Sequence, residues 1–155
     1  AYTVDEVRRF LEIDGLDIIE IPLNIFDNEL LKGGILKKIV KKKKRILARS
    51  IYLQGLFFID PDKVPSGMKL VIEPLRRLRG ISSEYDMTLQ ELAFLFVRDI
   101  PEISSLVIGV ETNEQLQNNM KLLNLPPLPN KIRNRIFKEF QNLPKELIKP
   151  TMWTR

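Results

Sequence analysis

Apolar residues recur along this chain at two different spacings, and segments of the two kinds alternate. Residues 3–11 open with the capping pattern Thr-x-x-Glu and then carry apolar side chains three and four positions apart, which predicts a helix. The β-rich run 18–23 predicts a strand that ends near its proline. Helical spacing returns over 31–40, although two glycines weaken its start, and residues 46–50 predict a second strand.

The next part of the chain is less regular. Proline and aspartate residues within 60–67 predict a long loop, after which Leu75 and Leu78 predict a helix that tolerates a proline in its first turn. Residues 88–91 repeat the capping pattern and precede apolar residues at helical spacing. A further helix is therefore expected, ending before Pro101.

The segment from Ser105 to Asn119 combines two signals. Residues 105–110 predict a short buried strand, and Thr112 to Gln115 form a Thr-x-x-Gln cap that opens a helix. The first amides of a helix have no intrahelical partners and its dipole end is positive, so a strand that runs into such a cap favours an anion. Taken alone, an ordinary strand-to-helix connection is the simpler interpretation.

The last thirty residues read as an addition to this alternating pattern. Prolines between 126 and 129 predict a stiff linker, and apolar spacing over 132–140 predicts an amphipathic helix before a polar tail that ends in Met152 and Trp153. We expect one unit over residues 1–125, followed by a linker, a terminal helix and a tail over 126–155.

Strands that alternate with helices predict an α/β fold with a parallel sheet. A closed (β/α)8 barrel takes about 250 residues, so three strands in this chain predict either roughly half of a barrel or a small open sheet. Half a barrel leaves two open strand edges, which favour self-association. The chain also begins on a helix cap without methionine, and we expect its start to be internal to something longer.

Composition narrows the chemistry. The chain has no cysteine and no histidine, so it lacks thiolates, the commonest general base and the commonest metal ligand, and we expect no metal site. No apolar run approaches the ~18 residues that span a bilayer, and we expect a cytoplasmic protein without a membrane contact. The basic run 41–45 could bind nucleic acid, but a solvated helix end is the favoured interpretation.

Four segments in order resemble the C-terminal half of the aldo-keto reductase superfamily, up to about Leu125. They read YTVDE, DIIEIPLN, RSIYLQG and VIGVETNEQLQNN, at residues 2–6, 17–24, 49–55 and 107–119. The last three resemble the sixth, seventh and eighth strands of that barrel. The form RSIYLQG is similar to a bacterial branch linked to cell-surface carbohydrate biosynthesis.

The resemblance implies a nicotinamide cofactor, NADP or NAD, at the carboxyl ends of the strands. It assigns the segment that wraps the pyrophosphate to Ser50, Tyr52, Gln54 and Gly55. The loop and helix that hold the adenosine phosphate correspond to Gly109, Val110, Glu111, Thr112, Gln115, Asn118 and Asn119. The contacts with the nicotinamide fall to Glu20 and Arg49. In members that prefer NADPH, a lysine and an arginine stand where this chain has Gly109 and Gln115. Glu111 could accept from a free ribose hydroxyl, so both cofactors stay open. Arg49 could stack on the nicotinamide or pair with Glu20.

The resemblance also implies that catalysis and cofactor binding depend on different halves of the barrel. The catalytic aspartate, tyrosine, lysine and histidine of such enzymes lie on the other half of the barrel, so this chain holds no catalytic residue. We expect it to supply the cofactor-binding half of an enzyme that reduces a small carbonyl substrate, with a carbohydrate-related compound as one class. The alternative is a non-catalytic assembly or regulatory module, and a nucleic-acid binder is a more distant one.

Overall fold

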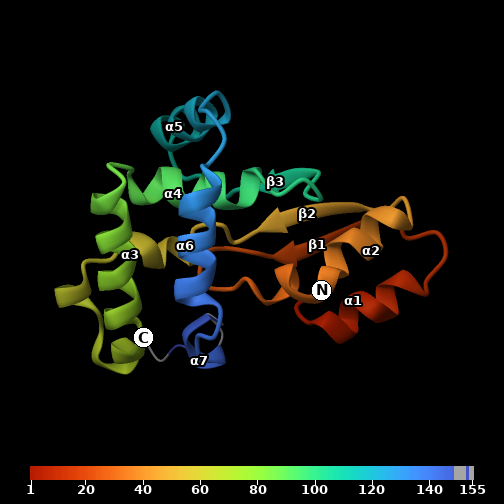
Figure 1. The fold of residues 1–155 in the computed structure, drawn as a ribbon, viewed down its shortest axis with the longest axis horizontal. Coiled ribbons are helices and arrows are strands. Elements are labelled where there is room, and N and C mark those ends of the chain that lie inside the picture. Colours follow the sequence, from red (N-terminus) through yellow and green to blue (C-terminus); the bar gives the residue numbers. More distant parts are fainter. Residues whose placement is uncertain (149–152, 154–155) are drawn as a thin grey trace.

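A three-stranded parallel sheet organises the fold, which a computed structural model describes for residues 1–148 and 153 (Figure 1). The strands are β1 (Ile18–Pro22), β2 (Arg45–Arg49) and β3 (Ser105–Val107), in that spatial order. Ile18 pairs with Arg45, and Arg49 pairs with Val107. Because all three strands run in the same direction, their carboxyl ends and the turns that follow lie at one edge of the sheet.

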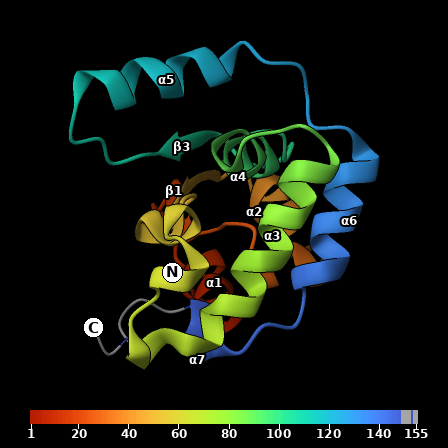
Figure 2. The ribbon, with the colours of Figure 1, turned by 90° about the vertical axis from the view of Figure 1, so that its left-hand side faces the viewer.

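Helices pack beside the sheet and extend to one side of it (Figures 1 and 2). The α-helices are α1 (Val4–Leu11), α2 (Ile35–Lys41), α3 (Ile72–Glu84), α4 (Leu89–Arg98), α5 (Asn113–Leu123), α6 (Asn130–Phe140) and α7 (Lys145–Ile148). Short 3-10 helices are η1 (Glu29–Gly34), η2 (Leu53–Phe58), η3 (Pro61–Lys63) and η4 (Ser66–Val71). No helix in the described part of the chain is long and apolar enough to cross a membrane.

The sheet is buried on one face and open on the other. Ile19, Ile21, Ile46 and Ala48 point to the covered face and are buried, with α2 packed against β2 and α4 against β3. Their neighbours along the strands alternate to the open face, where Ile18 is 48% exposed. This one-sided burial, with two free edges, is the arrangement of a partial barrel.

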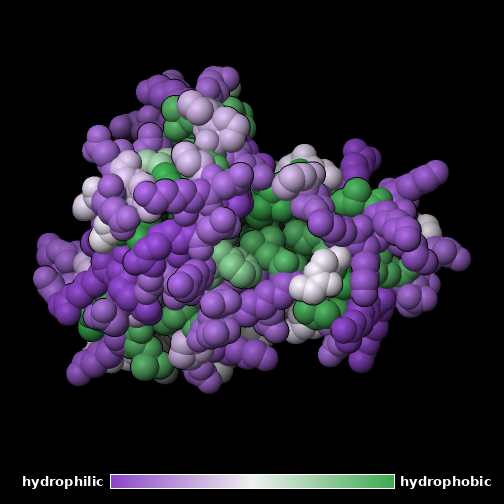
Figure 3. Space-filling view, viewed as in Figure 1, coloured by the Kyte–Doolittle hydropathy of each residue, from purple (hydrophilic) through white to green (hydrophobic). Residues whose placement is uncertain are grey.

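Aromatic residues join the sheet to the helices beside it. The ring of Phe26, in the loop after β1, packs edge-on against Phe57 of η2 with centroids 4.9 Å apart. Phe140 of α6 lies 5.0 Å from the same ring. All three are buried, so α6 is part of the core, although the expected division of the chain at residue 125 stays a prediction. On the face shown in Figure 3, apolar atoms gather in a hollow between α6 and α2, over β1 and β2.

Two arginines, one on α3 and one on α6, bind the largely buried carboxylate of Glu139. Glu139 accepts from Arg77 at 2.8 Å and also pairs with Arg135. The hydrogen bond from Arg135 lowers the pKa of Glu139 most, Arg77 adds to this, and burial opposes both. The pair ties α6 to α3 through charge as well as packing.

The capping patterns are confirmed. Thr3 accepts from the amide of Glu6, Thr88 and Glu91 form a reciprocal capping box, and Thr112 accepts from the amide of Gln115 at 3.2 Å. The predicted helix start at residue 31 is wrong. Gly33 and Gly34 have φ values of +64° and +67°, so the α-helix begins only at Ile35.

Two further expectations are corrected. The strand predicted over 105–110 ends at Val107 and is not buried, since Ser105 and Val107 are exposed and Leu106 is only partly buried. The tail predicted as polar forms α7 with two buried residues, Leu147 and Ile148, and the indole of Trp153 donates to the Leu147 carbonyl at 3.1 Å. Met152 lies outside the described residues.

The basic run is partly engaged within the chain. Lys44 donates to the carbonyls of Ile13 and Leu16 at 2.9 and 2.5 Å, and its ammonium lies 4.8 Å from the centroid of the Phe10 ring. Its charge therefore fixes the loop between α1 and β1.

Candidate functional site

A groove of about 880 Å³ opens where β2 and β3 end. Its walls are the turn after β2, the turn after β3, the first turn of α4 and the first two turns of α5. The described residues that line it are Arg49, Ser50, Ile51, Tyr52, Gln54, Gly55, Phe58, Gln90, Val107, Ile108, Gly109, Val110, Glu111, Gln115, Asn118 and Asn119. Arg49 is the one cationic side chain in that set and Glu111 the one carboxylate. A volume of this size is typical of a small-molecule or cofactor site.

The groove brings together most of the residues that the sequence singled out. Of the thirteen, eleven line it, and the two that do not are Glu20 and Thr112. Thr112 lies just behind the groove as the cap of α5. Glu20 lies on β1, outside the groove, and reaches it only through its contact with Arg49. The ligand contacts of all thirteen stay predictions.

Arg49 is held in place by three neighbours. Its Nε lies 2.9 Å from a Glu20 carboxylate oxygen, its guanidinium stacks 4.6 Å from the centroid of the Tyr2 ring, and its Nη1 donates to Ser50 Oγ at 3.1 Å. The sequence left two roles open for Arg49, stacking on a nicotinamide and pairing with Glu20, and the structure shows the ion pair with Glu20. Its side chain is 25% exposed and is one of the residues that line the groove.

The turn after β2 has an uncommon backbone. Ser50, Leu53 and Gln54 have φ values of +59°, +47° and +53°, and Gly55 follows at +80°. Only two other non-glycine residues in the described chain, Lys43 and Asp86, have positive φ. A left-handed non-glycine residue costs about 1–2 kcal/mol, and such strain persists where the surroundings hold it. Buried Leu53 anchors the turn from below.

The turn after β3 is closed by the helix that follows it. Gln115 uses both its backbone and its side chain, since its amide donates to Thr112 Oγ1 and its Oε1 accepts from the Glu111 amide at 2.8 Å. This fixes the start of α5 beside the groove. The first turn of α5, whose free amides carry the positive end of the helix dipole, therefore lies beside the groove that the β2 turn lines.

A polar contact joins the β2 turn to α5 across the groove. The Tyr52 hydroxyl donates to Asn119 Oδ1 at 2.6 Å, and Gln90 Nε2 donates to the same oxygen at 3.2 Å. Burial raises the pKa of Tyr52 to about 12, while the hydrogen bond with Gln90 acts in the opposite direction. The phenol is therefore neutral at physiological pH, and α5 is tied to the β2 turn and to α4.

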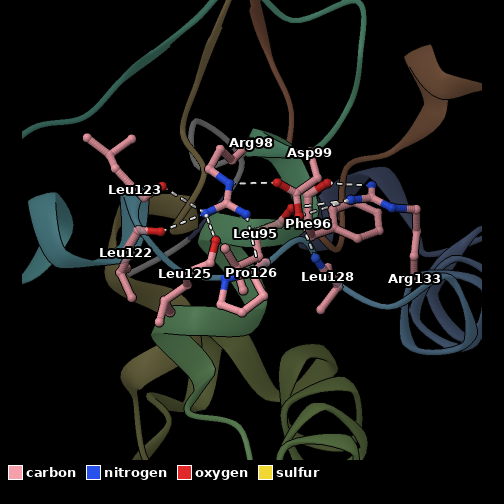
Figure 4. A network of polar contacts seen from close by, with 10 residues as sticks. All are labelled: Leu95, Phe96, Arg98, Asp99, Leu122, Leu123, Leu125, Pro126, Leu128 and Arg133. Atoms are coloured by element: carbon pink, nitrogen blue, oxygen red, sulfur yellow. Dashed lines mark hydrogen bonds and ion pairs between the residues drawn. The ribbon is translucent and has the colours of Figure 1, made fainter.

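The far end of α5 is fixed by an arginine on α4 (Figure 4). Arg98 donates to four backbone carbonyls, those of Leu122, Leu123, Leu125 and Pro126, at 2.7 to 3.3 Å. Its Nε pairs with Asp99 at 2.6 Å, and the same carboxylate accepts from the Leu128 amide at 2.6 Å. Arg133 of α6 approaches that carboxylate and donates to the Phe96 carbonyl at 2.7 Å. The network holds α5, the proline linker and α6 on α4.

Sequence reasoning missed several residues of the groove. Ile51, Phe58, Val107 and Ile108 line it as apolar wall, and Gln90 as a polar group. Ile51, Val107 and Ile108 lie at or just after the ends of strands, and this position could have identified them. Gln90 comes from the first turn of α4, far along the chain, and no local pattern points to it.

No protein-family profile matches the chain. One curated protein, a probable voltage-gated potassium channel subunit beta from Arabidopsis thaliana, is 31% identical over 93 residues, which are 57% of this chain and 28% of that protein. The chain thus spans less than a third of that relative's length.

Among solved structures, aldo-keto reductase AKR11C1 from Bacillus halodurans, in its holo form, is similar with a TM-score of 0.70 and 18% identity. The glycerol dehydrogenase AKR11B4 from Gluconobacter oxydans is similar with a TM-score of 0.68 and 17% identity. Both matches cover 97% of this chain and about half of the other protein, 51% and 50%. The chain therefore has the fold of about half of an aldo-keto reductase barrel, and the resemblance seen in its sequence is confirmed in its fold.

Proposed function

We propose that the groove binds a nicotinamide dinucleotide, and that this chain is the cofactor-binding half of an oxidoreductase of the aldo-keto reductase type. One observation carries the proposal: the turns after two neighbouring parallel strands and the start of α5 enclose a single groove. In α/β folds, ligands bind at the carboxyl ends of the strands, where helix N-termini favour phosphates.

The groove offers chemistry that fits a dinucleotide. Amide and hydroxyl groups of Ser50, Gln54 and Asn118 line it and can bond to ribose and phosphate oxygens. Gly109 lets a ligand approach the backbone, because no atom lies within 4 Å of where its Cβ would be. The cofactor supplies the hydride when bound, and the residues of this chain bind and orient it.

The charges in the groove bear on the choice between the two cofactors. A 2′-phosphate gains most from arginine or lysine, and the one cation at the groove, Arg49, is already engaged with Glu20. Glu111 adds a negative charge beside the α5 cap. We therefore propose that NADH binds at least as tightly as NADPH.

The activity that follows is reduction of a small carbonyl compound, and carbohydrate-derived aldehydes and ketones are the first class to screen. We place the general acid on the other half of the barrel, so the 155-residue chain alone should not turn over substrate. A cytoplasmic location stays a prediction.

Direct titration tests the proposed site. NADH fluorescence is followed as the chain is added, and Gly109→Phe is compared with Gly80→Phe. Neither glycine has a positive φ, and a Cβ added at either would meet no atom within 4 Å. Gly80 is an exposed residue of α3 outside the groove, whereas Gly109 lines the groove. We expect saturable binding that Gly109→Phe abolishes and Gly80→Phe preserves. Absence of binding to the unaltered chain, or equal binding by both variants, would refute the proposal.

The open edges of the sheet support a second part of the proposal, self-association. Nine large apolar residues near the two sheet edges are each 40–62% exposed. Four are on or beside β1 (Tyr2, Ile13, Leu16 and Ile18), and five are on β3, α5 and the turn between them (Val107, Val110, Leu116, Met120 and Leu123). At roughly 80 Å² each they offer about 700 Å² per copy, close to the ~800 Å² per partner of a stable interface. A two-fold axis along the strands would pair β3 of each copy with β1 of the other.

The non-catalytic alternative keeps one supporting observation. Arg49 is in contact with Glu20, Tyr2 and Ser50, so the positive charge at the groove is already engaged within the fold. The same titration decides between the two, because a module that has lost its cofactor binds neither nucleotide.

A further inference from the structure

Two asparagines in the loop after β1 are buried, and their side chains donate hydrogen bonds to different parts of the molecule. Asn24 is fully buried and Asn28 is 2% exposed. Asn28 donates only to a carbonyl of its own loop, that of Ile25, at 3.1 Å. The side-chain nitrogen of Asn24 instead reaches the turn after β2 and donates to the carbonyl of Ser50 at 3.2 Å.

The other half of the Asn24 side chain closes its own turn. Its Oδ1 accepts from the amides of Phe26 and Asp27, both at 2.9 Å, and its backbone amide donates to the Asp27 carbonyl at 3.1 Å. A buried amide costs free energy unless it is bonded, and here both ends are satisfied. Because the side-chain oxygen of Asn24 is held by the turn after β1, the side-chain nitrogen is a donor with a fixed position.

That donor acts on the residue where the β2 turn begins. Ser50 is the first of the residues with positive φ in that turn, at +59°, and its carbonyl also accepts from the Leu53 amide at 2.9 Å. An ordinary residue leaves this conformation readily unless its carbonyl is held. The turn that follows carries Tyr52 and Gln54 into the groove.

We propose that Asn24 is a positioning residue of the groove: its amide fixes the Ser50 carbonyl and so holds the β2 turn in the shape that receives the ligand. This inference rests on the proposed function for its effect on nucleotide binding, but its effect on the turn is independent of any ligand.

The test compares Asn24→Asp with Asn28→Asp in the full chain at pH 8. Both substitutions keep size and burial and remove one side-chain donor. The carboxylate introduced at position 24 still accepts from two turn amides, which favours the anion, but it cannot donate to Ser50. Hydrogen exchange of residues 50–55 is measured without ligand, NADH affinity by titration, and unfolding in urea as the measure of general damage.

We expect protection of residues 50–55 to fall about five- to tenfold more in Asn24→Asp than in Asn28→Asp, and NADH affinity to fall by a similar factor. Equal protection of the turn in the two variants overturns the inference. If the turn loosens but the unaltered chain binds no nucleotide, the positioning role stands and the proposed function fails. If the carboxylate prevents folding, Asn24→Ser and Asn28→Ser replace the pair, because a serine hydroxyl is too short to reach Ser50.

Discussion

Replacing Arg98 by methionine should loosen α5 from the rest of the molecule. The side chains of Arg98 and Asp99 are only 15% and 14% exposed, and the guanidinium serves four carbonyls besides its 2.6 Å ion pair. Methionine keeps most of the volume but provides no donor. The carboxylate of Asp99 would then keep the Leu128 amide and the more distant Arg133, whose nitrogen lies 3.9 Å away.

The expected loss follows from burial. Removing one partner of a buried ion pair costs about 3–5 kcal/mol, and residual exposure places this pair near the lower end, at about 3 kcal/mol. For a chain of this length, that corresponds to a fall in Tm of roughly 6–12 °C. Urea and thermal unfolding of Arg98→Met would be compared with Arg76→Met, whose pair with Asp62 at 2.9 Å is exposed and should cost less than about 1 kcal/mol.

A double-mutant cycle isolates the ion pair from the carbonyl bonds. Asp99→Asn removes the charge partner, and the coupling between the two substitutions should be about 1 kcal/mol or more for groups in one network. If Arg98→Met costs no more than Arg76→Met, the network does not hold α5 and the reasoning fails.

Three further outcomes are expected. Glu111→Lys should raise NADPH affinity about five- to tenfold relative to NADH, because a cation replaces the groove's carboxylate. The pKa of Glu139 is lower in the folded chain than in the unfolded one, where it is about 4.3. The Glu139 carboxylate therefore stabilises the fold above that unfolded pKa, and this stabilisation is lost as pH falls through the folded pKa. In urea unfolding measured between about pH 7 and 3, Glu139→Gln should therefore lose less stability on acidification than the unaltered chain. In sedimentation runs the chain should be a dimer, and Ile18→Lys combined with Val107→Lys should make it a monomer.

Each of these has a control in the chain. Glu114→Lys adds the same charge to α5 without lining the groove, so an equal change in NADPH affinity would contradict a local effect. An unchanged acid response in Glu139→Gln would mean that the arginine pair contributes no linked stability. Val40→Lys alters an exposed apolar residue on α2, away from the strand edges, and should leave a dimer intact; a monomeric unaltered chain would rule out self-association.

Local features of the fold could be predicted because their causes are local. The threonine caps at residues 3, 88 and 112 depend on contacts within four residues, and the sequence shows both partners. Most of the groove could also be predicted, because residues that follow neighbouring parallel strands necessarily meet at one edge of the sheet.

Features that depend on distant partners could not be predicted. The exposure of β3 depends on which elements pack against it, which the spacing of its own apolar residues does not encode. Asn24 reads as an ordinary turn residue until Ser50, 26 positions later, is seen beside it. Gln90 enters the groove only because α4 packs against α5.

If the turns after β2 and β3 receive one dinucleotide, amide NMR spectra of the labelled chain should show it during titration with NADH. We expect saturable shifts concentrated in residues 49–55 and 107–119, with small changes in α1, α2 and α6. Shifts concentrated outside those two segments, or in only one of them, would contradict it.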